Sequence, residues 1–253
     1  MNFRDKVVLI TGASSGIGRS IALNLSKENC KLILVARRVE LLEEMRRELQ
    51  IDEDNLLILK CDVGKKTEVA DAYKSINEKF GTVDVAILNS GIGRTVTVKN
   101  YDSRFADEIF GVNVLGIIYW VEQLLPGFVR DKKGIIAGIS SLADNRGFSG
   151  SGFYCASKAA ASIYLEGLRV ELKNYGIRVI TIKPGFVKTA MTDDNKFKMP
   201  FLLQPDEAAR IIIGGIKKEK RVIQFPWQMV FLSRMVGILP GGFYEWLASK
   251  TKT

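Results

Sequence analysis

Histidine is absent from all 253 residues of the chain. Its absence excludes Ser-His-Asp and Cys-His catalytic relays, zinc sites with histidine ligands and imidazole pH switches. Cysteine is scarce: Cys30, Cys61 and Cys155 are an odd number of thiols without Cys-x-x-Cys spacing. We therefore expect no metal site, and any proton transfer must use a side chain other than imidazole.

Secretion signals and unbroken apolar runs are also missing. No charged-then-apolar segment precedes Val7, which together with the unpaired cysteines favours a cytoplasmic location. An apolar C-terminal extension, about residues 222–253, is interrupted by Pro226, Arg234 and Pro240, before the roughly 20 apolar residues of a membrane span accumulate. Four roles stay open for this extension: core packing, a subunit contact, a lid wall, or an interfacial helix that associates the protein with an anionic membrane.

Charge and length set further limits. Lys and Arg number 37 against 28 Asp and Glu, a formal net charge of +9, but no basic stripe interleaved with aromatic residues occurs. We therefore expect no nucleic-acid partner. No internal repeat or Pro/Ser-rich linker divides the chain, so residues 1–253 are predicted to form one domain.

Short β-branched runs alternate with longer amphipathic stretches, the pattern of strand-helix-strand units. The predicted strands are Val7–Thr11, Leu32–Ala36, Leu56–Lys60, Val85–Asn89, Ile135–Ser140, Arg178–Lys183 and Val222–Phe225. The predicted helices are Gly16–Lys27, Glu40–Gln50, Thr67–Lys79, Phe105–Arg130, Tyr154–Asn174 and Asp206–Lys217. Because the strands are apolar on both faces, the sequence predicts an α/β Rossmann fold with a doubly wound, parallel seven-stranded sheet.

A glycine-rich turn directly follows the first strand. Its spacing, Gly-x3-Gly-x-Gly, differs from the commoner Gly-x-Gly-x-x-Gly. Glycines let the backbone approach a pyrophosphate, and the following helix offers free N–H donors and a positive dipole end. The predicted phosphate-binding residues are Gly12, Ser14, Ser15, Gly16, Ile17 and Gly18.

The end of the second strand is where an NAD-selective fold places a carboxylate on the ribose. Here the chain has Arg37 and Arg38, which suit a 2′-phosphate instead. The pair therefore favours NADP(H) over NAD(H), although two solvated surface arginines would have the same sequence.

Tyr154 and Lys158 are four residues apart at the start of a predicted helix, so their side chains share one face. An ammonium beside a phenol favours the phenolate, and we expect Lys158 to lower the pKa of Tyr154. The same spacing also occurs in helices with a buried Tyr and an exposed Lys. Ser141, at the end of the fifth predicted strand, could bind the oxygen that Tyr154 protonates, and Ser140 is its close competitor.

Together these motifs resemble the short-chain dehydrogenase/reductase family, from about Lys6 to Lys188. The family's motifs match Thr11–Gly18, Asp62 with Val63, Asn113, Ser141, Tyr154 with Lys158, and the segment containing Pro184, Gly185, Val187 and Thr189. One departure occurs: the family's Asn-Asn-Ala-Gly is here Leu88-Asn89-Ser90-Gly91, in which Asn89 and Gly91 keep the cofactor-lining positions.

The resemblance implies an NADP(H)-dependent oxidoreductase that interconverts a carbonyl and an alcohol. Asn113, Ser141, Tyr154 and Lys158 would be catalytic, with Tyr154 as acid and base and Asn113 holding a water for proton exchange. Tyr154 and Lys158 would also contact the cofactor.

The family further implies a substrate lid, about residues 189–204, and a homodimer or homotetramer. The apolar lid residues, among them Met191, Phe197 and Phe201, favour a lipophilic small-molecule substrate or else complete the core. A 3-oxoacyl-thioester reductase and a non-catalytic NADP(H)-binding module remain the alternatives.

Overall fold

The computed structural model describes residues 1–193 and 199–250. In these residues one parallel sheet has the strand order β3-β2-β1-β4-β5-β6-β7. The strands are β1 Val7–Thr11, β2 Lys31–Ala36, β3 Leu56–Lys60, β4 Val85–Leu88, β5 Gly134–Ile139, β6 Ile177–Pro184 and β7 Val222–Phe225. The predicted doubly wound, parallel seven-stranded Rossmann fold is confirmed.

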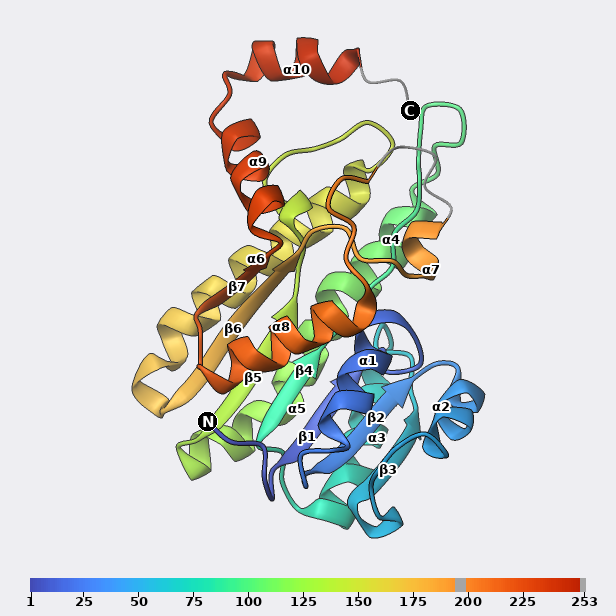
Figure 1. The fold of residues 1–253 in the computed structure, drawn as a ribbon, viewed down its shortest axis with the longest axis vertical. Helices are drawn as coiled ribbons and strands as arrows, with labels where there is room; N and C mark the ends of the chain where they lie inside the picture. The colour runs from blue at the N-terminus through green and yellow to red at the C-terminus, as the bar shows by residue number, and fades with distance from the viewer. Residues whose placement is uncertain (194–198, 251–253) are drawn as a thin grey trace.

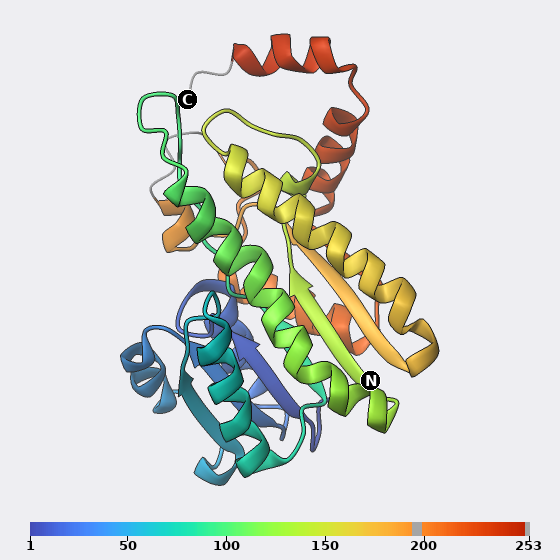
Figure 2. The ribbon, with the colours of Figure 1, turned by 180° about the vertical axis from the view of Figure 1, so that it is seen from behind.

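Helices cover both faces of the sheet (Figures 1 and 2). The helices are α1 Gly16–Leu25, α2 Val39–Arg46, α3 Lys66–Phe80, α4 Arg104–Phe110, α5 Gly116–Asp131, α6 Gly152–Glu171, α7 Ala190–Asp193, α8 Pro205–Lys217, α9 Trp227–Gly237 and α10 Gly241–Ser249. Alternate strand residues point to opposite layers: Val8 and Ile10 pack with α1 and α8, whereas Val7 and Leu9 pack with α3 and α5. This is why the strands read as apolar throughout.

Helix α2 ends at Arg46, four residues before the predicted end at Gln50. Just beyond this end, the amides of Glu48 and Leu49 bond to carbonyls only three residues back, at 2.8 and 3.2 Å. Such tight bonds close a helix, so the sequence prediction was too long here.

The predicted helix Phe105–Arg130 is one continuous helical stretch, Arg104–Asp131, with a π-helical turn at Gly111–Leu115 between α4 and α5. By length and composition alone this stretch could cross a membrane. However, 44% of its most apolar window is buried inside the structure, and Trp120 and Leu124 are almost inaccessible. We therefore interpret it as a core helix of the α/β layer.

The C-terminal extension forms β7, α9 and α10. Within α9 and α10 no residue is buried, and both helices lie beyond the end of the sheet (Figure 1). The sequence left core packing open as one role of the extension. For α9 and α10 in a single chain, that prediction is wrong.

Candidate active site

The candidate site lies at the carboxyl ends of the strands, where the strand order reverses between β1 and β4. Loops after adjacent strands diverge at such a point and leave a crevice for a ligand. The loops after β1, β4, β5 and β6 carry most of the predicted site residues.

The glycine turn joins β1 to α1. Gly12 and Gly16 have φ values of +65° and +54°, and a Cβ on Gly18 would lie 2.4 Å from the Gly12 carbonyl oxygen. The side chain of Ser15 makes no capping hydrogen bond within the described chain, so it leaves the first N–H groups of α1 available. Ser14 is buried, and Ile17 packs partly against the core. The turn fits a dinucleotide pyrophosphate, held by backbone donors.

Both arginines after β2 are exposed at the rim of this turn. Arg38 Nη2 donates a hydrogen bond of 3.0 Å to Ser15 Oγ, so one guanidinium is already directed at the glycine turn. An anion held at the turn would therefore lie close to the Arg38 guanidinium.

The wall after β4 is built around Asn89. Its backbone N donates to Thr11 Oγ1 at 3.0 Å and its Nδ2 donates to the Thr11 carbonyl at 3.0 Å, which ties β4 to β1. Leu88 is buried in the core, so the departure from the family pattern at this position is accommodated by apolar packing. A Cβ on Gly91 would lie 3.2 Å from Lys158 Nζ, so the backbone approaches the ammonium closely here.

Asp62 and Val63, which follow β3, make most of their contacts with neighbouring protein groups. Asp62 Oδ1 accepts from the Gly64 amide at 3.0 Å, and its own amide donates to Glu68 at 2.7 Å. Val63 is buried against Gly116 of α5. Its side chain therefore positions the wall, and the exposed part of Asp62 is what a ligand can contact.

The segment after β6 lies against the glycine turn and forms one wall of the crevice. A Cβ on Gly16 would lie 2.8 Å from Thr189 Cγ2, so Thr189 sits directly on the glycine turn. Pro184 and Val187 are buried. Gly185 instead faces the C-terminal extension, because a Cβ there would lie 3.2 Å from Pro226.

Asn113 lies in the π-helical turn and is fully buried. Its Oδ1 accepts from the Ile92 amide at 2.8 Å, and its Nδ2 donates to the Ile92 carbonyl and to Ser157 Oγ, both at 2.9 Å. Both amide hydrogens are therefore committed to protein. A π-bulge at a functional side chain has no signature in the sequence period.

Ser141, Tyr154 and Lys158 come together at the end of β5 and the start of α6. Ser141 is hydrogen-bonded to the Tyr154 hydroxyl. Lys158 Nζ donates to the Ile139 carbonyl at 3.1 Å and lies 5.7 Å from the centroid of the Tyr154 ring. Ser140 faces the other way, since its Oγ donates to the Lys158 carbonyl at 2.8 Å.

The pKa of Tyr154 runs opposite to the sequence expectation. Burial raises the pKa of this hydroxyl, and the hydrogen bond from Ser141 only partly opposes the rise. Burial also lowers the pKa of Lys158 to about 8. The predicted lowering of the Tyr154 pKa by Lys158 is thus wrong here, because the ammonium lies over the ring and bonds to Ile139 instead of the hydroxyl.

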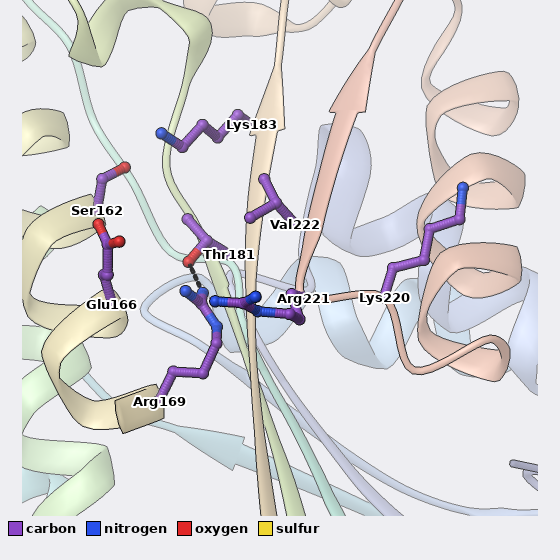
Figure 3. A pocket seen from close by; sticks show the side chains of 8 residues that line it. All are labelled: Ser162, Glu166, Arg169, Thr181, Lys183, Lys220, Arg221 and Val222. Carbon is purple, nitrogen blue, oxygen red and sulfur yellow. Dashed lines mark hydrogen bonds between the residues drawn. The ribbon is translucent and has the colours of Figure 1, made fainter. Parts of the chain in front are cut away.

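A buried polar network behind Ser140 was missed by the sequence analysis. Ser162 Oγ donates to the carboxylate of Asp144, which pairs with Lys183 at 2.6 Å, and the same Oγ lies 2.8 Å from Ser140 Oγ. The network borders a cavity of about 450 Å³ between α6 and the β6-β7 edge (Figure 3). Among the described residues that line this cavity, none is a predicted site residue.

The thiols and carboxylates offer no second chemistry in the part of the chain that is described. The three cysteines are free and buried, and burial raises the pKa of Cys30 to about 11 and of Cys61 to about 12. Across residues 1–193 and 199–250, no three Cys, Asp or Glu side chains come together as a metal site.

Comparisons with known proteins place the chain in a family. A family model described as short chain dehydrogenase matches residues 6–199, which include every predicted site residue. An uncharacterized oxidoreductase of Myxococcus xanthus is 34% identical over 247 residues, 98% of each chain. The NADP-dependent 3-hydroxy acid dehydrogenase of Schizosaccharomyces pombe is 33% identical over 232 residues, 86% of this chain and 89% of the relative.

Among solved structures, an alcohol dehydrogenase from the archaeon Thermococcus sibiricus, complexed with 5-hydroxy-NADP, superposes with a TM-score of 0.77. It is 30% identical, over 87% of this chain and 94% of that one.

Proposed function

The chain belongs to the short-chain dehydrogenase family of oxidoreductases, and we propose that it interconverts a carbonyl and an alcohol with NADP(H), acting on a lipophilic substrate. The observation that carries this proposal is the hydrogen bond between Ser141 and Tyr154, beside the buried Lys158, in the crevice that the glycine turn shares.

The protonation states favour carbonyl reduction by this site. With its pKa raised by burial, Tyr154 keeps its proton at neutral pH and can donate it to a carbonyl oxygen as negative charge develops there. The Ser141 hydroxyl can donate a second hydrogen bond to the same oxygen. Lys158, with a pKa of about 8, can return a proton to the site near neutral pH.

Asn113 serves this chemistry as a positioning residue. Because its amide bonds to both backbone groups of Ile92 and to Ser157, it holds the loop after β4 against α6. That contact keeps Gly91 beside Lys158, where an added Cβ would lie 3.2 Å from Lys158 Nζ.

The residues around the crevice fit a dinucleotide. When bound, NADP(H) would supply the hydride, and the protein contributes orientation and electrostatics. The residues proposed to hold it are those of the glycine turn with Arg37, Arg38, Asp62, Asn89, Lys158 and Thr189. The S. pombe relative is NADP-dependent, which supports the preference.

Replacing Arg37 with alanine is expected to raise the KM for NADPH about tenfold or more, and the KM for NADH little. A charge-assisted hydrogen bond to the 2′-phosphate would be lost, and NADH has no such phosphate. Steady-state kinetics with each cofactor measures the difference. Arg47→Ala, which removes an exposed arginine beyond the end of α2, is the matched control. Equal effects of Arg37→Ala on both cofactors would contradict the NADP(H) assignment.

The segment after β6 supports a lipophilic substrate. Met191, Phe201 and Leu202 are 43%, 47% and 38% exposed, so these side chains do not complete the core, whereas Leu203 packs on it. Phe197, the other apolar residue of the predicted lid, lies outside the described residues. A Cβ on Gly93 would lie 3.3 Å from the Tyr154 ring and 3.7 Å from Met191 Sδ, so these residues border the proposed reaction centre.

The proposal includes a homodimer or homotetramer in the cytoplasm. Ile163 and Val170 of α6 are 71% and 72% exposed, which supports a subunit contact on that helix. The three unpaired, buried cysteines suit a reducing compartment.

An NADPH-consumption assay over lipophilic ketones, aldehydes and 3-oxoacyl thioesters tests the proposed function. We expect turnover with ketones or aldehydes. Turnover confined to acyl thioesters would favour the 3-oxoacyl-thioester reductase. NADPH binding without turnover of any of them would make the chain a binding module and overturn the enzymatic proposal.

A further inference from the structure

The helices α9 and α10 present an unusually apolar outer surface. Between Trp227 and Leu247, large apolar side chains are 43% to 75% exposed. These side chains are Trp227, Phe231, Leu232, Met235, Ile238, Phe243, Trp246 and Leu247. We call this set the outer apolar face. Exposed patches of this kind mark interaction surfaces.

The opposite side of these helices is fixed to the loop between β5 and α6. Ser233 Oγ donates to the Leu142 carbonyl at 3.1 Å, and Asn145 Nδ2 donates to the Ser233 carbonyl at 2.8 Å. Tyr244 donates to the Gly147 carbonyl at 2.5 Å. Because both helices are anchored in this way, the outer apolar face has a defined orientation.

The outer apolar face follows helical spacing. On α9, Trp227, Phe231 and Met235 are four residues apart; on α10, Phe243 and Leu247 are as well. Each helix therefore turns one continuous apolar stripe away from the molecule.

Cations border these stripes. A groove of about 440 Å³ beside α9 has Val222, Trp227 and Phe231 in its lining, together with Lys220 and Arg234. Lys220 is turned toward α8, on the groove side, whereas its neighbour Arg221 is turned toward α6 (Figure 3).

The end of α10 repeats this pairing of a cation with apolar side chains. Lys250 Nζ lies 3.7 Å from the centroid of the Trp246 ring. Glu245 is the one acidic residue between positions 227 and 249 of the sequence. Over positions 220–250 the sequence has four basic residues, Lys220, Arg221, Arg234 and Lys250, against this one acid, so exposed apolar side chains and an excess of cations occur along the same segment.

We propose that the outer apolar face docks on an anionic lipid bilayer. The aromatic and aliphatic side chains would enter the boundary between headgroups and acyl chains, and Lys220, Arg234 and Lys250 would contact the headgroups. The net charge of +9 adds attraction at longer range. A second copy of the chain fits less well, because a two-fold contact places identical cationic surfaces against each other. The proposal does not depend on the catalytic assignment.

Vesicle co-sedimentation of the full-length protein tests the proposal, with phosphatidylcholine vesicles and with vesicles that also contain phosphatidylglycerol. We expect binding to the anionic vesicles that weakens with added salt and is about tenfold tighter than binding to neutral ones. Phe231→Ser and Trp246→Ser, at positions 59% and 54% exposed, should each weaken it about tenfold.

Tyr175→Ser removes an aromatic side chain that is 45% exposed at the far end of α6, and this control should bind as the wild type does. Thermal melting of each variant verifies that it is folded. Absence of binding to anionic vesicles, or unchanged binding by both folded test variants, would overturn the proposal. So would a shift of Phe231→Ser from dimer to monomer in light scattering with unchanged vesicle binding, since a second copy would then be the occupant.

Discussion

Replacing Tyr154 with phenylalanine is expected to lower kcat about a thousandfold, which is within the range for loss of a general acid. The variant keeps the aromatic ring that lies beside Lys158 and Gly93 and loses only the hydroxyl bonded to Ser141. Cofactor affinity should therefore change little. Steady-state turnover, together with NADPH titration by fluorescence, measures the two quantities separately.

Tyr164→Phe is the matched control for that experiment. Tyr164 lies on the same helix, packs against the core and has a pKa that burial also raises. Because it is ten residues from Tyr154 and outside the crevice, the control should retain turnover. Comparable activity in both variants would remove Tyr154 from the proposed acid-base role.

Replacing Lys158 with methionine is expected to lower kcat/KM about a thousandfold and at the same time to stabilise the fold. Burial of the charged Lys158 side chain destabilises the fold, as the lowering of its pKa from 10.5 to about 8 indicates. A shift of that size corresponds to about 3 kcal/mol of unfolding free energy. In the variant, loss of the hydrogen bond to the Ile139 carbonyl reduces this gain in stability by about 1 kcal/mol. Urea unfolding at pH 7 should show a variant more stable by about 2 kcal/mol.

The stability difference should also depend on pH. Between the folded pKa of about 8 and the ordinary value of 10.5, the unfolded chain holds a proton on Lys158 that the folded chain has released. Stability of the wild type at this site therefore rises with pH in that window, and the advantage of the variant should shrink. Lys74→Met, at an exposed position of α3, should show neither effect. A pH-independent advantage, or a less stable variant at pH 7, would contradict the burial argument.

The sequence was sufficient for those features that local patterns encode. Apolar strand runs and amphipathic helices are periodic over a few residues, so the seven strands and the doubly wound layering followed from them. The glycine turn was equally readable, since Gly12 and Gly16 adopt the positive φ that only glycine takes easily. The four-residue spacing from Tyr154 to Lys158 likewise predicted that both lie on one face of a helix.

Features that depend on burial were not readable in the same way. The direction of the Tyr154 pKa follows from desolvation, which neighbours far away in the chain impose. The pairing of Asp144 with Lys183 joins the turn after β5 to strand β6, and the bonds of Asn113 to Ile92 require a π-helical turn. For Ser140 and Ser141 the sequence left two neighbours in competition, and the direction of each side chain at the strand end separates them.

The C-terminal extension separates the properties that follow from residue types from those that follow from tertiary packing. Its composition showed an apolar segment too interrupted to span a membrane, and that much follows from residue types alone. Whether such residues are buried depends on what the rest of the chain packs against them. Since α1 and α8 already cover that face of the sheet, α9 and α10 are left outside it with their apolar stripes exposed. The sequence thus determined the fold class and the set of candidate catalytic residues, whereas the tertiary structure alone decided protonation, side-chain direction and exposure, because these arise from contacts between distant segments.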